Sequence, residues 1–152
     1  MSSLIRRLLL PLLLLLPLGN AALAAPQLDL AAYKGKVVYI DFWASWCGPC
    51  RQSFPWMKDM QAKYGRDGFV IIAINVDQEK KLADKFLAEF NPAFTVLFDS
   101  NGTLASQFKV QTMPSSFMLD RNGQPRFKHL GFHEGKRADY EQEITQLLSE
   151  KS

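Results

Sequence analysis

The sequence from Val37 to Cys50 reads VVYIDFWASWCGPC, and this stretch decides the fold expected for the chain. Residues 37–43 are β-branched or aromatic apart from Asp41, a composition that predicts a buried central strand. After residue 46 the apolar positions follow at the spacing of a helix. We therefore expect a strand, a short turn and a helix, with Cys47 and Cys50 at the start of the helix.

The spacing of Cys47 and Cys50 indicates redox chemistry. The first N–H groups of a helix lack partners and carry a partial positive charge, which favours a thiolate at Cys47 and makes it the expected nucleophile. Gly48 is expected to leave the Cys47 sulfur uncovered, and Pro49 is tolerated because the first turn needs no N–H from it. Cys50, one turn further on, can attack a mixed disulfide at Cys47 and release the partner.

Two segments flank this stretch and carry a wider resemblance. They are Lys34-Gly35-Lys36-Val37-Val38 and Met113-Pro114-Ser115-Ser116-Phe117-Met118-Leu119-Asp120. Residues 41–50 resemble the active-site segment of thioredoxins, and residues 28–148 are similar to the exported TlpA-like and ResA-like thiol:disulfide oxidoreductases. The resemblance implies an α/β fold, a thioredoxin-like three-layer α/β/α sandwich. Its central sheet is mixed, and a helix-plus-strand insertion precedes the cis-proline loop.

The resemblance also implies roles for individual residues. Asp41 is expected to accept a proton from Cys50, and its burial without a partner would raise its pKa. Thioredoxins place a lysine near this acid, whereas the matching position here is Ala73. Pro114 is expected to be cis and to pack beside Cys47, and the backbone of Met113 to pair with an extended substrate segment.

The two tryptophans of the motif are expected to have different roles. Trp46 adjoins the nucleophile and is expected to shield it and to contact substrate, together with Gly48 and Pro49. Trp43 is expected in the core.

The N-terminus has the features of a secretory signal. Residues 1–24 contain Arg6-Arg7, an apolar run over 8–18 and the small-residue pattern Ala22-Leu23-Ala24. Cleavage would leave residues 25–152 as one thioredoxin-like domain in the periplasm, with an uncleaved anchor as the alternative. Without the two arginines the charge balance is 16 minus 15, a net charge of +1, which indicates no nucleic-acid partner.

The rest of the chain alternates between strand and helix patterns. Strands are predicted over 69–76, 94–98, 116–120 and 126–130, and helices over 79–90, 103–108 and 136–149. The helix over 79–90 is expected to turn Leu82, Phe86, Leu87 and Phe90 inward.

Several functions remain open at this point. The resemblance implies a protein-disulfide reductase that needs no cofactor. Its expected substrates are disulfide-containing exported proteins, a class that includes cytochrome c precursors. A membrane electron donor of the thiol-disulfide interchange type would reduce it again after each cycle. The alternatives are a Cu(I)-binding metallochaperone, a dithiol oxidant, a peroxide reductase and a merely structural disulfide. His129 and His133 form a superficially zinc-like set with the cysteines, but ordinary surface histidines are the preferred interpretation and no metal is predicted.

Overall fold

The structure is a computed structural model that describes residues 28–151, so the predicted signal segment lies outside the described residues. Within these described residues, five strands and four α-helices follow one another. In chain order they are β1 Val37–Trp43, α1 Gly48–Tyr64, β2 Phe69–Asn75, α2 Lys80–Phe90, β3 Thr95–Phe98, α3 Thr103–Gln107, β4 Ser115–Leu119, β5 Pro125–Leu130 and α4 Arg137–Ser149. Short 3₁₀ turns lie at Leu30–Tyr33 (η1), Gly65–Asp67 (η2) and Glu134–Lys136 (η3). Within residues 28–151 we find no helix with the length and apolar character needed to cross a bilayer.

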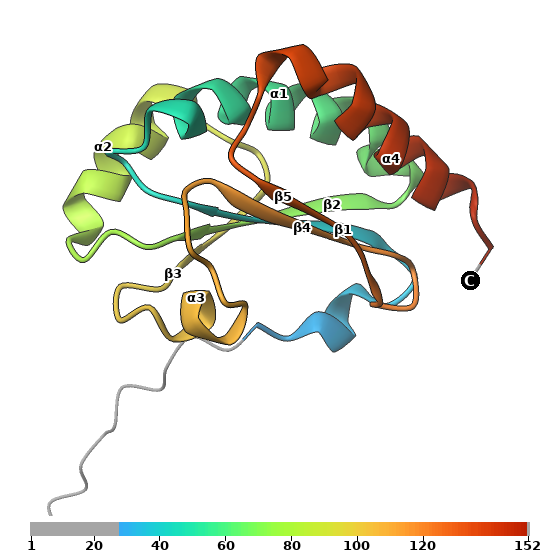
Figure 1. Cartoon of the computed structure of the whole chain (residues 1–152), viewed down its shortest axis with the longest axis horizontal. Helices are drawn as coiled ribbons and strands as arrows, with labels where there is room; N and C mark the ends of the chain where they lie inside the picture. Colours follow the sequence, from blue (N-terminus) through green and yellow to red (C-terminus); the bar gives the residue numbers. More distant parts are fainter. Residues whose placement is uncertain (1–27, 152) are drawn as a thin grey trace, which may run out of the picture.

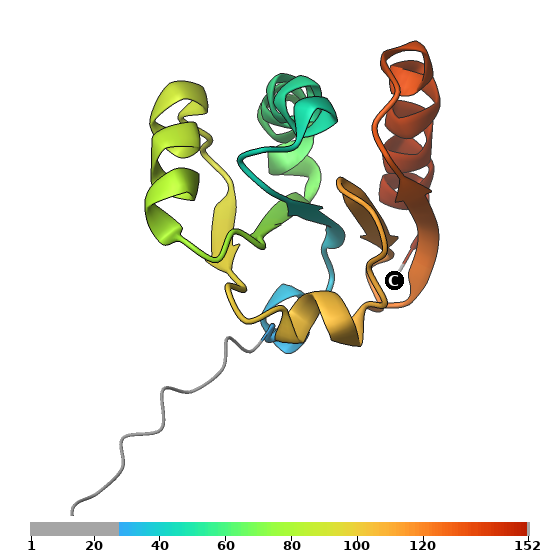
Figure 2. The same cartoon turned by 60° about the vertical axis from the view of Figure 1, so that its left-hand side comes forward.

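The strands form one mixed sheet in the order β3-β2-β1-β4-β5. β1 and β3 run parallel to β2, whereas β4 is antiparallel to both β1 and β5. Helices α1, α2 and α4 cover one face, while α3 and η1 lie on the other (Figures 1 and 2). The predicted three-layer α/β/α sandwich with a mixed sheet is confirmed, as is the helix-plus-strand segment, α2 and β3, ahead of the cis-proline loop.

The alternating side chains of β1 divide the core in two. Tyr39 and Trp43 pack under α1, α2 and α4, whereas Val38, Ile40 and Phe42 pack towards α3 and η1. All seven residues of β1 are buried, as predicted for a central strand. The turn that follows β1 is therefore anchored to a fully buried strand.

Most predicted boundaries agree with the structure to within one residue, but one predicted core residue is wrong. Leu82 is 47% exposed, and Ala83 and Phe86 supply the fully buried positions of α2. The helix begins at Lys80, and Leu82 N donates to Glu79 O in its first turn. Leu82 thus lies in the first turn of α2, where it lines a surface pocket with Ser45 and Arg51 and remains exposed.

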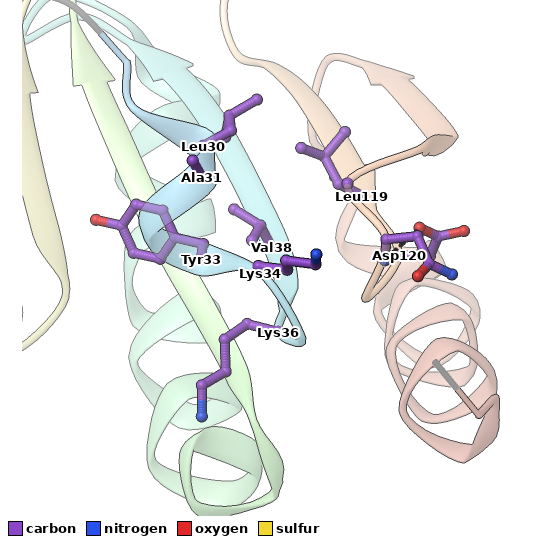
Figure 3. A pocket seen from close by; sticks show the side chains of 10 residues that line it. Leu30, Ala31, Tyr33, Lys34, Lys36, Val38, Leu119 and Asp120 are labelled. Carbon is purple, nitrogen blue, oxygen red and sulfur yellow. Dashed lines mark hydrogen bonds between the residues drawn. The ribbon is translucent and has the colours of Figure 1, made fainter.

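A cavity of about 270 Å³ opens beside η1, at the end of β1 that lies away from the cysteines. Leu30 and Val38 line one side of it and Leu119 the other (Figure 3). Val38 precedes Cys47 by nine residues and points to the opposite face of the sheet from Trp43. This cavity is therefore separate from the candidate redox site.

Candidate redox site

Cys47 and Cys50 form a disulfide at the N-terminus of α1. Cys47 is the N-cap residue, and its Sγ accepts a hydrogen bond from Cys50 N at 3.2 Å. The cap places the sulfur at the positive end of a 17-residue helix, where a thiolate is stabilised once the disulfide is reduced. The predicted helix start is therefore confirmed, with the nucleophile candidate at the N-cap.

The two cysteines differ in access to solvent. Cys50 is completely buried, and Cys47 retains 4% of its surface, so the expectation that its sulfur is uncovered is wrong. The side chains packed around the end of β1 enclose it, although Gly48 and Pro49 are themselves exposed. Trp46 is 70% exposed, whereas Trp43 is buried as predicted. Of the two cysteines, only Cys47 therefore keeps any surface that a partner could reach, and the exposed Trp46 directly precedes it in the chain.

A buried carboxylate that sequence reasoning missed holds the turn before Cys47. Asp77, 3% exposed, accepts hydrogen bonds from both the backbone N and the Oγ of Ser45, each at 2.9 Å. Asn75 Nδ2 donates to the same carboxylate at 2.7 Å. Because both carboxylate oxygens are occupied, Asp77 is a structural clamp on the turn that carries the cysteines.

Asp41 has a very different environment. It is 1% exposed on the sheet face under α1, and its Oδ2 has no hydrogen-bond partner among the described residues. Desolvation by burial raises the pKa of this carboxyl well above its usual range. Across the sheet it pairs with Ala73 on β2, the position expected to match the thioredoxin lysine. A proton on Asp41 is therefore favoured at pH values where exposed carboxyls are ionised.

The Met113-Pro114 peptide bond is cis, as predicted. Phe42 pairs with Ser115, so this loop emerges beside the end of β1, at the edge of the sheet from which the cysteine turn also emerges. Gly131 N donates to Pro114 O at 2.8 Å and Ser115 Oγ to Thr112 O at 2.7 Å, which ties the loop to its surroundings. Pro114 is buried, and the half-buried Met113 packs against both parts of the core.

Leu130 is a surface residue of this edge that sequence reasoning missed. It pairs with Ser115 and is 52% exposed. Together with Trp46 it gives the edge an apolar surface on either side of the cysteine turn and the cis-proline loop. Its exposure could not be recognised in the sequence, because the strand pattern over 126–130 does not show which face is covered.

His129 is not the ordinary surface histidine that the sequence indicated. Its side chain is 15% exposed, and it contacts Ser116 on β4 and Glu143 on α4. Within residues 28–151, no three His, Cys, Asp or Glu side chains gather in a way that could hold a metal ion. His129 therefore belongs to a polar cluster beside the redox site, to which we return below.

This combination of a mixed sheet, an N-capping Cys-x-x-Cys pair and a cis-proline loop defines a thioredoxin-like fold. A model of the Redoxin family matches residues 18–144, and the chain belongs to that family. Within the thioredoxin superfamily it is a TlpA/ResA-like protein.

Individual relatives agree with this assignment. The thiol-disulfide oxidoreductase ResA of Oceanobacillus iheyensis is 34% identical over 63% of this chain and 50% of its own length. The chain spans about half the length of the curated relatives it matches. A crystal structure described as a thiol:disulfide interchange protein DsbE from Chlorobium tepidum is 49% identical, with a TM-score of 0.77 over 79% of this chain and 85% of that chain. StoA from Bacillus subtilis is 25% identical, with a TM-score of 0.63 over 74% and 84% of the two chains.

Proposed function

We propose that this protein is a thiol:disulfide oxidoreductase that reduces disulfides of exported proteins. The observation that carries the proposal is the asymmetry of the cysteine pair. Cys47 caps a helix and keeps 4% of its surface exposed, whereas Cys50 is fully buried. A nucleophile needs access and a low thiol pKa, whereas a resolving cysteine needs neither. ResA of Oceanobacillus iheyensis is named a thiol-disulfide oxidoreductase, and the Chlorobium tepidum structure is described as a thiol:disulfide interchange protein, which supports the same chemistry.

The proposed reaction has two steps. The Cys47 thiolate attacks one sulfur of the substrate disulfide, forming a mixed disulfide and releasing the other substrate sulfur as a thiolate. Cys50 then gives its proton to Asp41 and attacks Cys47, so that the Cys47–Cys50 disulfide forms and the second substrate thiolate leaves. Asp41 is suited to this role because it is buried on the face that α1 covers and has an unpartnered oxygen.

The substrate is proposed to bind along the edge that carries Trp46 and the cis-proline loop. The exposed Trp46 ring and the neighbouring Gly48 and Pro49 offer contact area, and the backbone of Met113 can pair with an extended segment as an added strand. Recognition through main-chain hydrogen bonds and one apolar contact suits substrates of varied sequence.

The cellular setting is proposed from the resemblance and from residues 1–24. A cleaved signal peptide would deliver residues 25–152 to the periplasm. There the oxidised pair would be re-reduced by a membrane electron donor of the thiol-disulfide interchange type. Cysteines of cytochrome c precursors are the proposed substrate class.

The activity is tested with a protein disulfide and dithiothreitol as the terminal reductant. We expect the wild-type protein to accelerate reduction of insulin disulfides well above the rate with dithiothreitol alone, and a Cys47→Ser variant to give no acceleration. Turbidity from the released chains measures the rate. A wild-type rate equal to that of the variant would overturn the proposed function.

A further inference from the structure

A row of polar side chains crosses the sheet from the buried Asp41 to the protein surface. The strand registers place Asp41 on β1 opposite Ser116 on β4, and Ser116 opposite His129 on β5. Directly opposite residues of antiparallel strands point to the same face of the sheet, with Cβ atoms about 4.5–5.5 Å apart. The three side chains therefore form one lateral row. The row lies on the face of the sheet that carries α1 and α4, and Figure 2 shows these helices over that face.

Close contacts connect most of this row. Tyr39 Oη donates to Ser116 Oγ at 2.8 Å, and Ser116 Oγ lies 3.3 Å from His129 Nδ1. His129 Nε2 lies 2.8 Å from Glu143 Oε2, an ion-pair distance, and this oxygen forms no hydrogen bond within the described residues. Glu143 Oε2 is buried, but the Glu143 side chain as a whole is 23% exposed, so the row reaches solvent through the rest of that side chain. It opens into a cavity of about 240 Å³ between β5 and α4.

Ser116 can form hydrogen bonds in either direction along the row. A hydroxyl donates once and accepts twice, and Tyr39 occupies one of the two acceptor positions. When Asp41 is ionised, Ser116 can donate to Asp41 and accept from His129. When Asp41 is protonated, Ser116 can accept from Asp41 and donate to His129. The step from Asp41 to Ser116 spans a single pair of opposite residues, within reach of a side-chain rotation or one bridging water.

We propose that Ser116, His129 and Glu143 form a proton relay that connects Asp41 with solvent during disulfide exchange. The inference rests on the proposed function, because it concerns the proton that Asp41 takes from Cys50. In the resolving step Cys50 loses its proton to Asp41, the Cys47–Cys50 bond forms, and the bond from Cys47 to the substrate sulfur breaks. The substrate sulfur leaves with the electron pair, and Asp41 holds one proton that must depart before the next cycle.

The relay solves a problem of access. While the mixed disulfide exists, the substrate covers the edge around Trp46 and the cis-proline loop, above the buried Asp41. The relay runs from Asp41 along one face of the sheet, across β4 and β5, and ends between β5 and α4. Asp41 can pass its proton to Ser116, Ser116 its own to His129 Nδ1, and His129 its Nε2 proton to Glu143 and water. One proton enters the row and one leaves it.

The surroundings keep His129 neutral, as a relay requires. Burial, with Lys136 as a second cause, lowers the pKa of His129, and burial raises the pKa of Glu143. The cavity at the end of the row is lined by charged or titratable residues of β5, η3, α4 and the loop between β5 and η3, namely Lys128, His133, Lys136, Asp139, Tyr140 and Glu143. A neutral imidazole accepts at one nitrogen and donates at the other, which is the arrangement the two contacts need.

The test is single-turnover oxidation of the reduced protein by a protein disulfide, with acid quenching to count the mixed disulfide at Cys47. We expect His129→Ala to form the mixed disulfide at the wild-type rate but to resolve it about 10-fold more slowly, a modest part of the range for proton-transfer catalysis. Added imidazole, which can enter the vacated end of the row, should restore the rate. Ser116→Ala should slow resolution similarly, but imidazole should not restore the rate. The missing hydroxyl lies behind His129, where imidazole cannot enter.

The matched control is His133→Ala, which removes the other histidine of the same cavity but leaves the row intact. It should resolve at the wild-type rate with or without imidazole. Resolution of His129→Ala at the wild-type rate, or slow resolution that imidazole leaves unchanged, would overturn the relay while leaving the proposed function standing. If the wild-type protein forms no mixed disulfide at all, the proposed function fails and the relay fails with it.

Discussion

Replacing Cys50 with serine is expected to stop turnover and to trap substrate proteins on Cys47. Cys50 is fully buried with its sulfur bonded to Cys47, so no other group can take its place in the resolving step. We expect protein-disulfide reduction to fall by at least ~10⁴-fold, the scale on which losing a member of a covalent catalytic unit acts. Non-reducing gel electrophoresis after mixing with substrate, followed by mass spectrometry, would show the Cys47-linked adducts.

Two variants serve as controls for the trap. Cys47→Ser should lose activity as completely but form no adduct, because the nucleophile itself is gone. Ser53→Ala removes a buried hydroxyl that donates to Cys50 O at 3.1 Å, and it should retain turnover and trap nothing. Adducts formed by Cys47→Ser through Cys50 would reverse the assigned roles of the two cysteines.

Replacing Asp41 with asparagine is expected to slow catalysis and to stabilise the fold. Without a carboxylate to receive the Cys50 proton, resolution should slow by about 10²-fold at neutral pH, within the range for general base catalysis. The same substitution removes a buried, unpartnered charge, so we expect the free energy of unfolding of the oxidised protein to rise by about 1–3 kcal/mol at pH 8. Stopped-flow kinetics measures the first effect and denaturant titration the second.

The stability effect should depend on pH in a defined direction. Burial raises the pKa of Asp41 in the folded protein well above the value of about 4 that it has in the unfolded chain. The folded state therefore binds more protons between these two pKa values, and wild-type stability falls as the pH rises through that window. The advantage of Asp41→Asn should be smallest near pH 4 and largest above the raised pKa.

Asp84→Asn is the matched control for both measurements. Asp84 is an exposed aspartate of α2, paired with Lys80 at 2.5 Å, and its neutralisation should change neither resolution nor the pH profile of stability. A loss of stability in Asp41→Asn at pH 8 would show that the Asp41 carboxylate has a stabilising partner in solution, contrary to the environment described above.

The parts of the fold that could be predicted are those in which sequence pattern and burial coincide. The run over 37–43 has almost no polar residue, and a fully buried strand is its only stable placement. The Cys-x-x-Cys pair follows that run, so the start of the helix places Cys47 at the N-cap and Cys50 in the first turn. The cis-proline loop was predicted through resemblance alone, since nothing in the local residues separates it from an ordinary Met-Pro bond.

The features that could not be predicted depend on contacts between distant segments. Asp77 lies outside every motif that the sequence analysis singled out, and only the fold brings it to Ser45, 32 positions earlier. His129 looked like a surface residue because its alternation along the strand does not reveal that α4 covers it with Glu143. Leu82 followed the helical pattern of apolar residues, but it lies in the first turn of α2, where it lines a surface pocket with Ser45 and Arg51 and stays exposed.

The central claim is that the Cys47–Cys50 pair works as a reductant, and its equilibrium reduction potential tests this most directly. The pair would be titrated in defined glutathione or dithiothreitol buffers, with the oxidised fraction counted by thiol alkylation. We predict a value near about −270 mV, the potential of thioredoxin-like reductants. A value near about −120 mV would mean that the reduced form is strongly stabilised and that the protein donates disulfides, which would contradict the proposed direction.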